Sequence, residues 1–290
     1  MSHTDIRIGT LVQMNRAAGY IRQILPHGFE SFSLTFGAKE KGDLDIAARE
    51  TMPLVAGKAV ISSIGFFGNP LQKPEDVKQV EECIDKVHLF GASLVCTFPG
   101  ALDGQPVPES MPAFKKVWAP LVKRAADQGV RIAFENCDMG GRWESARANI
   151  AHSPSAWEMI FNAVPSDNLG LEWEPCHQMV SLVDPLPNLR KWLPKIFHIH
   201  GKDATIAWDV LKTSGLRGGK PWCWHRTPGF GDTNWTDLIT ILRQNKWTGS
   251  IDIEGWHDPV YRDALEMTGQ VHGMNYLKSC RGGPFVANPK

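Results

Sequence analysis

Short apolar runs alternate with amphipathic segments from one end of the chain to the other. The runs are rich in β-branched or aromatic residues and are bounded by glycine, proline or polar residues, a pattern typical of buried strands. Most of the chain is therefore expected to repeat a strand followed by a helix. The predicted strands are residues 6–12, 31–36, 59–66, 93–98, 131–136, 169–173, 196–200 and 250–254.

The segments between these runs have the periodicity of helices that cover one face of a sheet. Segment 74–90 begins with Pro-Glu-Asp, which suits a helix N-terminus. Because parallel strands need a crossover between them, usually a helix, the alternation predicts a parallel α/β fold. One face of segment 74–90 carries the apolar residues Val77, Val80, Ile84 and Val87.

The number of units narrows the fold class. Eight strand–helix units in 290 residues favour one closed (β/α)8 TIM barrel, with its active site at the carboxyl ends of the strands. An open doubly wound sheet is the alternative, but no glycine-rich phosphate-binding motif follows any predicted strand. The chain has no Gly/Ser-rich linker and no fixed-period repeat, so we expect a single domain over residues 1–290.

Composition excludes several classes of partner. Lys+Arg and Asp+Glu both count 31, and this balance argues against nucleic acid or an anionic membrane as the main partner. The apolar runs are far shorter than the about 20 residues of a membrane-spanning helix, and residues 1–5 lack the features of a signal peptide. The six cysteines form no CxxC pair and are expected to be free thiols. We therefore expect a cytoplasmic protein.

Titratable residues gather at the ends of the last four predicted strands. Because alternate residues of a strand point to the same face, one residue from each strand is expected in a ring at the barrel mouth. With no buried cation evident from the sequence, three carboxylates and an imidazole need a divalent cation among them. Mixed oxygen and nitrogen ligands suit manganese, iron, cobalt or zinc better than calcium. The ring consists of Glu135, Glu174, His200 and Glu254.

Residues one layer deeper are expected to support this ring. His198 and Asp252 share strand faces with the expected ligands, and a metal-bound histidine needs an outer partner. Glu172 stays open as a ligand in place of Glu174. Cys176 is not expected to act as a nucleophile, because no triad-like base accompanies it.

Five segments carry a further pattern. They are Glu135-Asn136, Glu174-Pro-Cys-His177, His198-Ile-His200-Gly-Lys-Asp203, Pro228-Gly-Phe-Gly231 with Trp235, and Ile251-Asp-Ile-Glu254. In order and spacing they resemble the sugar isomerase/epimerase superfamily, the xylose isomerase-like TIM barrels. The resemblance implies one divalent metal on the same four ring residues, with manganese favoured and cobalt, iron, magnesium or zinc as alternatives. The superfamily commonly has aspartate where this chain has Glu174.

The resemblance implies a metal-dependent isomerase or epimerase of carbohydrate metabolism that acts on a keto-sugar or sugar derivative. A proton next to a carbonyl would be removed through a metal-stabilised enediolate, with Glu135 and Glu254 taking and returning it. A leaving group β to the enolate would instead make the enzyme a lyase or dehydratase, for example one that deglycosylates a 3-keto-glycoside. Such barrels often form homo-oligomers, and a lyase would form a hetero-oligomer.

The segment that follows the seventh predicted strand, residues 202–232, is expected to form much of the substrate pocket. It is rich in tryptophan and basic residues, which suit a sugar face and its oxygen-rich groups. Together with residues from neighbouring strand ends, it supplies the expected substrate contacts. These are His177, Trp222, His225, Arg226, Trp256 and His257.

Two other function classes use the same barrel. An apurinic endonuclease needs further histidine ligands on early strands, and the third and fourth predicted strands end without any. The balanced charge also gives no sign of a DNA-binding surface. A non-enzymatic binding protein would not need the complete set of acid–base and ligand residues. Both classes are therefore disfavoured.

Overall fold

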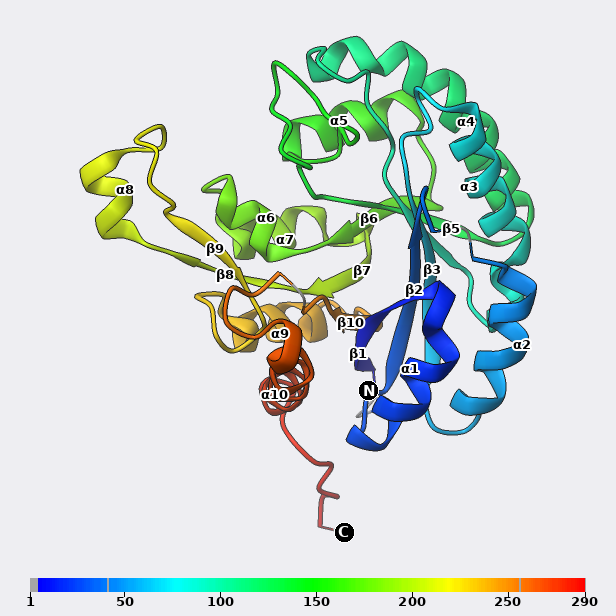
Figure 1. The fold of residues 1–290 in the computed structure, drawn as a ribbon, viewed down its shortest axis with the longest axis vertical. Coiled ribbons are helices and arrows are strands. Elements are labelled where there is room, and N and C mark those ends of the chain that lie inside the picture. Colours follow the sequence, from blue (N-terminus) through cyan, green and yellow to red (C-terminus); the bar gives the residue numbers. More distant parts are fainter. Residues whose placement is uncertain (1–4, 41, 256, 290) are drawn as a thin grey trace. The chain divides into compact units, whose positions relative to one another are not determined.

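Eight parallel strands form the framework of the protein. The computed structural model describes residues 5–40, 42–255 and 257–289. The strands are β1 (Ile6–Gln13), β2 (Ser31–Gly37), β3 (Val60–Phe67), β4 (Leu94–Thr97), β5 (Arg131–Glu135), β6 (Leu169–Trp173), β7 (Ile196–Gly201) and β10 (Gly249–Ile253). Their order, β1-β10-β7-β6-β5-β4-β3-β2, closes the sheet into a barrel (Figure 1). This confirms the eight predicted strands and the predicted (β/α)8 class.

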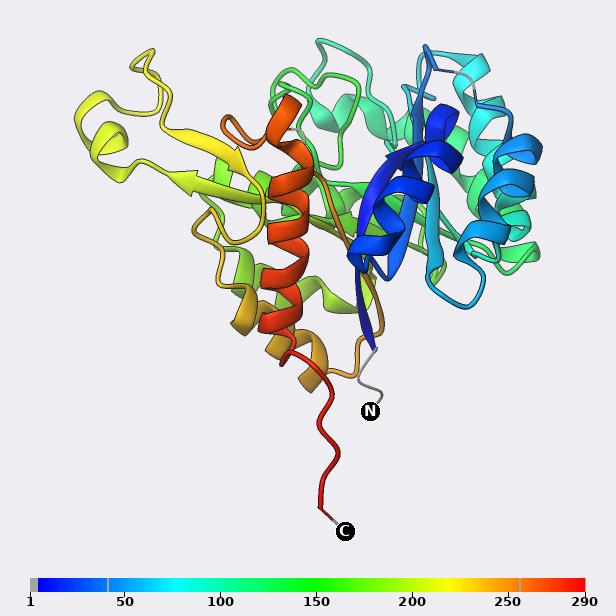
Figure 2. The same ribbon diagram turned by 60° about the horizontal axis from the view of Figure 1, so that its bottom comes forward.

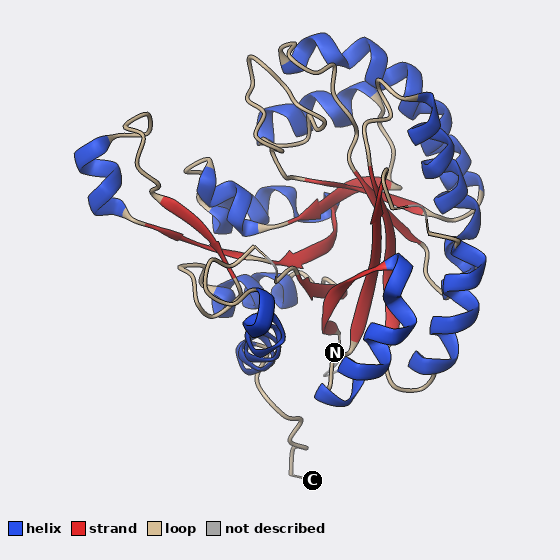
Figure 3. Ribbon diagram, viewed as in Figure 1, coloured by secondary structure: helices blue, strands red, loops and turns tan. Residues whose placement is uncertain are grey.

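Helices separate the strands along the chain, as the alternating pattern predicted (Figure 3). Segment 74–90 forms α3 and then a 3₁₀ turn at Val87–Phe90, with Pro74 in its first turn. None of the described helices has the length and apolar character needed to cross a membrane. The helices are α1 (Ala17–Ile24), α2 (Leu44–Val55), α3 (Pro74–Lys86), α4 (Met111–Asp127), α5 (Pro154–Ala163), α6 (Pro175–Val180), α7 (Pro185–Trp192), α8 (Trp208–Ser214), α9 (Trp235–Gln244) and α10 (Glu266–Cys280).

The contacts within the chain define two compact units. The N-terminal unit comprises Leu11–Trp173 and Lys195–His198, and the C-terminal unit comprises Met1–Thr10, Glu174–Pro194 and Ile199–Lys290. Both units contribute strands to the barrel sheet. The single domain expected over residues 1–290 stays a prediction.

Aromatic packing orients β5 in the N-terminal unit. The ring of Trp118 on α4 lies 4.6 Å from that of Phe134 at an interplanar angle of 80°, and Phe114 also packs edge-on against Phe134. Phe134 therefore faces the helix layer. Since successive strand residues point to opposite faces, Ala133 and Glu135 point to the barrel interior.

In the C-terminal unit, a two-stranded antiparallel hairpin follows the barrel strand β7. It consists of β8 (Asp203–Ile206) and β9 (Cys223–Arg226), and α8 lies between its two strands in the sequence (Figure 2, yellow). Segment 202–232, the segment expected to form much of the substrate pocket, thus contains a hairpin and a helix. The sequence pattern did not predict these elements.

The buried carboxylate of Asp203 anchors the base of this hairpin. Its Oδ1 accepts hydrogen bonds from the backbone N–H groups of Ala204 and Thr233 at 2.8 and 3.0 Å. Its Oδ2 accepts a hydrogen bond from the indole N–H of Trp235 at 2.9 Å. A Cβ at Gly231 would lie 2.5 Å from this carboxylate, so only glycine allows the close approach. Burial raises the pKa of Asp203, and these hydrogen bonds oppose the shift.

We predict that Asp203→Ala lowers the free energy of unfolding by about 1.5–3 kcal/mol, because the buried donors lose a charged acceptor. Urea unfolding followed by circular dichroism would measure the loss. Asp127→Ala is the matched control: Asp127 is exposed and pairs with Lys123 one helical turn away. It should change the stability only slightly. Equal effects of the two substitutions would contradict the anchoring role.

Candidate active site

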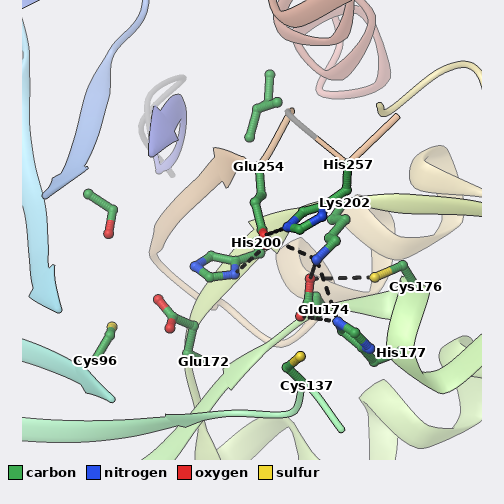
Figure 4. Close-up of polar contacts among 12 residues, drawn as sticks. Cys96, Cys137, Glu172, Glu174, Cys176, His177, His200, Lys202, Glu254 and His257 are labelled. Carbon is green, nitrogen blue, oxygen red and sulfur yellow. Dashed lines mark hydrogen bonds and ion pairs between the residues drawn. The ribbon is translucent and has the colours of Figure 1, made fainter. Parts of the chain in front are cut away.

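The ends of β6, β7 and β10 bring three of the expected ligand residues together in the C-terminal unit. Glu174 directly follows β6, His200 lies in β7, and Glu254 directly follows β10. All three are buried, and each offers a ligand atom within 4.8 Å of the others. His200 Nδ1 lies 3.3 Å from Glu254 Oε2 (Figure 4). The structure thus places two carboxylates and an imidazole at one site.

Glu135, the fourth expected ligand, lies in the N-terminal unit as the last residue of β5. It is buried, with 6% of its surface exposed. Its backbone carbonyl accepts a hydrogen bond from the Asn149 side chain at 2.9 Å, which fixes the end of the strand. In the β5–β6 ladder Glu135 is in register with Glu172, two residues before Glu174.

Lys202 supplies a buried cation that the sequence argument did not foresee. The expectation that no buried cation lies beside the expected carboxylate ligands is wrong. The Lys202 side chain is 3% exposed, and its Nζ lies 3.1 Å from Glu254 Oε1 and 3.6 Å from Glu174 Oε2. Lys202 directly follows β7 and lies two residues beyond His200, and this proximity in the sequence is the signal that could have indicated it.

This cation explains how the two carboxylates stay charged. Burial raises the pKa of Glu174, but His177 and Lys202 outweigh burial and hold the pKa below its usual range. Burial likewise raises the pKa of Glu254, and Lys202 with His200 and His257 outweighs it. Both groups are therefore carboxylates at neutral pH.

Three histidines expected to contact substrate surround the carboxylates. His177 Nε2 in α6 lies 3.0 Å from Glu174 Oε1, and His257 Nε2 lies 2.8 Å from Glu254 Oε1. The ring of His225 in β9 stands edge-on to that of His177 at 4.9 Å and to that of His257 at 5.9 Å. Burial, with the nearby Lys202 and His177, lowers the pKa of His225 to about 4. His225 is therefore neutral at physiological pH.

The other expected substrate residues have different surroundings. Arg226 Nε, at the end of β9, lies 3.0 Å from Asp258 Oδ2, so its guanidinium is already paired. Trp222 and Trp224 are half-buried on the same hairpin, where the Trp222 carbonyl accepts a hydrogen bond from the Ala207 N–H. Trp256 lies outside the described residues.

A second polar cluster occupies the interior of the N-terminal unit. Glu172 Oε1 lies 2.7 Å from His198 Nδ1, and Cys96 Sγ lies 4.0 Å from the same nitrogen. All three side chains are at most 1% exposed. Burial and the charge of Glu172 raise the pKa of the Cys96 thiol well above its usual value. Glu172 therefore contacts His198 in this second cluster, whereas Glu174 lies with His200 and Glu254.

Cys176 lies beside the carboxylate cluster without the environment of a nucleophile. Its Sγ lies 3.5 Å from Glu174 Oε2. Burial and the charge of Glu174 raise the pKa of its thiol well above the usual value. Since the thiolate is the reactive form of cysteine, the arrangement disfavours covalent chemistry at this position.

A sequence model of the family described as "Xylose isomerase-like TIM barrel" matches residues 23–280. The chain belongs to this family. The match confirms the resemblance drawn from the strand-end motifs.

Two curated relatives of the chain are named inosose dehydratase. The protein from Clostridium tetani is 32% identical over 102 residues, which cover 33% of each chain. The protein from Clostridium botulinum is 24% identical over 164 residues, which cover 54% of this chain and 50% of that protein. The chain therefore spans half or less of the length of these relatives.

Solved structures share the fold over nearly the whole chain. A xylose isomerase domain protein from Planctomyces limnophilus has a TM-score of 0.70 at 18% identity, covering 95% of this chain and 96% of that one. The 3-keto-D-glucoside 4-epimerase YcjR from E. coli has a TM-score of 0.67 at 13% identity, covering 95% and 100%. At these identities the likeness shows the fold alone.

The donor set in the C-terminal unit fits a divalent cation. Two carboxylates and an imidazole are the mixed oxygen and nitrogen ligands that such ions take. Glu254 Oε2 is buried and lies 3.3 Å from His200 Nδ1, so a single ion could contact both atoms. Glu174 and Glu254 together carry one negative charge more than Lys202 balances.

We predict that Lys202→Met lowers the free energy of unfolding of the metal-free protein by about 3 kcal/mol or more, because two buried carboxylates lose their cation. Urea unfolding in the presence of a chelator would measure it. Lys86→Met is the control, since Lys86 pairs with Asp45 and Glu82 at a partly exposed site. A Lys202 variant no less stable than this control would contradict the counter-ion role.

Proposed function

We propose that the chain is a divalent-metal-dependent enzyme that isomerises or epimerises a keto-sugar or sugar derivative by moving a proton next to a carbonyl. The observation that carries this proposal is the buried group of Glu174, His200 and Glu254 at neighbouring strand ends. Membership of the xylose isomerase-like family and a structural neighbour named as an epimerase support it.

The metal would be held by Glu174, His200 and Glu254, with Glu135 as the fourth ligand. Glu135 is included because it ends the strand that pairs with β6 and because the family resemblance assigns a ligand there. When bound, the ion would polarise the substrate carbonyl and make the neighbouring C–H bond more acidic. Manganese is favoured, with cobalt, iron, magnesium or zinc as alternatives.

The carboxylates of the chain would move the proton. Glu254 is ionised despite its burial, so it can accept a proton from a carbon held against it. Glu135 would be the partner that returns a proton. Return to the opposite face of the same carbon gives an epimer, and return to the adjacent carbon gives an aldose–ketose isomer.

The surrounding residues would bind and enclose the sugar. His177 and His257 contact the two carboxylates, and the neutral imidazole of His225 can both donate and accept hydrogen bonds to sugar hydroxyls. These groups form a polar surface suited to a small polyhydroxylated substrate.

A dehydratase or lyase is the second candidate, and Lys202 is the observation that favours it. Its ammonium lies between the two carboxylates, 3.1 Å from Glu254. Once Glu254 has taken the proton next to the carbonyl, the electron pair left on that carbon can expel a β-hydroxyl. Lys202 would donate a proton to this leaving group, which departs as water. The relatives named inosose dehydratase support this candidate.

We predict that the protein binds one divalent ion and that Glu174→Gln weakens Mn²⁺ binding by about 100-fold or more, because an anionic ligand is replaced by a neutral amide. Isothermal titration calorimetry of chelator-treated protein would measure it. Glu172→Gln, two residues earlier in the chain, is the matched control and should bind Mn²⁺ far more tightly than Glu174→Gln. The reverse order would assign the ligand to Glu172.

We predict that Glu254→Gln lowers turnover by about 10²–10⁴-fold while the protein stays folded, because an amide cannot accept the proton. The assay incubates the Mn²⁺-loaded protein in D₂O with a panel of keto-sugars, inososes and 3-keto-glycosides. NMR identifies the carbon that gains deuterium and the product formed. Glu266→Gln on α10 is the control and should retain the parent rate.

The same assay separates the two candidate reactions. Deuterium in a product that keeps all its oxygens indicates isomerisation or epimerisation, whereas loss of water or of a glycosyl group indicates elimination. Full activity of a folded, metal-loaded Glu254→Gln protein would contradict the assignment of Glu254 as the base.

A further inference from the structure

The carboxylate of Asp258 accepts four hydrogen bonds within the C-terminal unit. It is buried, and its Oδ2 accepts hydrogen bonds from Arg226 Nε at 3.0 Å and from the Thr227 N–H at 2.9 Å. Its Oδ1 accepts hydrogen bonds from the N–H groups of Val260 and Tyr261 at 2.8 and 2.9 Å. One carboxylate therefore joins the end of β9 to the segment that follows β10.

These hydrogen bonds keep the carboxyl group of Asp258 ionised. Burial raises the pKa of Asp258, but the N–H donors of Tyr261, Thr227 and Val260, with the guanidinium of Arg226, outweigh it and lower the pKa. A charge-assisted hydrogen bond is about twice as strong as a neutral one. The two segments are thus joined more firmly than a neutral side chain would allow.

An aromatic stack reinforces the same junction. The ring of Phe230 lies parallel to that of Tyr261 at 4.0 Å and to that of His272 on α10 at 4.1 Å. Gly229, which precedes Phe230, has a φ of +93°, and a Cβ there would lie 2.8 Å from the Tyr276 ring. The turn after β9 therefore packs closely against α10, and its conformation is restricted by these contacts.

Each joined segment carries a histidine of the candidate active site. His225 immediately precedes Arg226, and His257 immediately precedes Asp258. Their rings are 5.9 Å apart, and His257 Nε2 lies 2.8 Å from Glu254 Oε1. The separation of these two rings depends on how the segments are fastened to each other.

We infer that Asp258 is a positioning residue that fastens segment 257–261 to segment 225–230 and so holds His225 and His257 at the substrate side of the carboxylates. Arg226 takes part as a donor to Asp258, which is a structural task besides the substrate contact expected from the sequence. The fastening itself follows from the contacts, whereas its effect on substrate binding rests on the proposed function.

Hydrogen exchange of the whole metal-free protein, followed by mass spectrometry, tests the fastening without any substrate. Asp258→Asn should speed exchange about tenfold or more in both segments, 225–230 and 257–261, because a neutral amide cannot satisfy four donors. Arg226→Gln removes one donor and should speed exchange in both segments by a smaller factor. It also keeps the test usable if Asp258→Asn does not fold.

Asp5→Asn is the matched control, because the Asp5 carboxylate likewise holds an arginine, Arg243, through two hydrogen bonds. It should leave exchange in both segments at the parent rate. Faster exchange confined to segment 257–261 in Asp258→Asn would show that Asp258 stabilises only its own turn, through Val260 and Tyr261, and would overturn the inference. An equal response to Asp5→Asn would also overturn it.

Kinetics of the Mn²⁺-loaded protein add the functional readout. On any substrate that the parent turns over, Asp258→Asn should raise KM about tenfold and leave kcat within a few-fold, because the carboxylates that move the proton are unchanged. A fall in kcat with unchanged KM would refute the positioning of substrate-binding histidines. If the parent turns over no substrate, the proposed function fails, and the exchange experiment still decides on the fastening.

Discussion

Two carboxylates buried side by side depend on the ammonium of Lys202. Without a cation, desolvation and mutual repulsion would protonate one of them, and the site would lose its anionic character. Lys202 lies within 3.6 Å of both Glu174 and Glu254. Any further cation that bound these carboxylates would therefore compete with Lys202 for their oxygens.

The position of Lys202 follows from its neighbours along the chain. Lys202 directly follows β7, and its N–H donates a hydrogen bond to the His200 carbonyl at 2.9 Å. Asp203, the next residue, is fixed by hydrogen bonds from Thr233 and Trp235. The backbone of Lys202 is therefore fixed on both sides. Its side chain turns towards the carboxylates, with Nζ 3.1 Å from Glu254 Oε1 and 3.6 Å from Glu174 Oε2.

Sequence reasoning predicted the barrel because eight apolar runs must be buried and their spacing leaves room for helices. Strand alternation also predicted that Glu174, His200 and Glu254 share a site. It missed the burial of Lys202, since burial depends on the packing of residues distant in sequence. It missed the β8–β9 hairpin, whose strands have only four residues each, too few for a pattern to be distinguished from chance. The partner of Arg226, Asp258, lies 32 residues away, and no local pattern connects the two.

The hairpin after β7 is held mainly at its base. Besides Asp203, Asp232 accepts a hydrogen bond from the Ile206 N–H at 2.8 Å and donates its own N–H to the Ala204 carbonyl at 2.8 Å. α8 lies between the two strands in the sequence, and its Trp208 is 52% exposed. Insertions or deletions around α8 can therefore accumulate during evolution without displacing the carboxylates. The hairpin thus combines a base fixed beside the buried carboxylates with an outer part whose length could change independently of them.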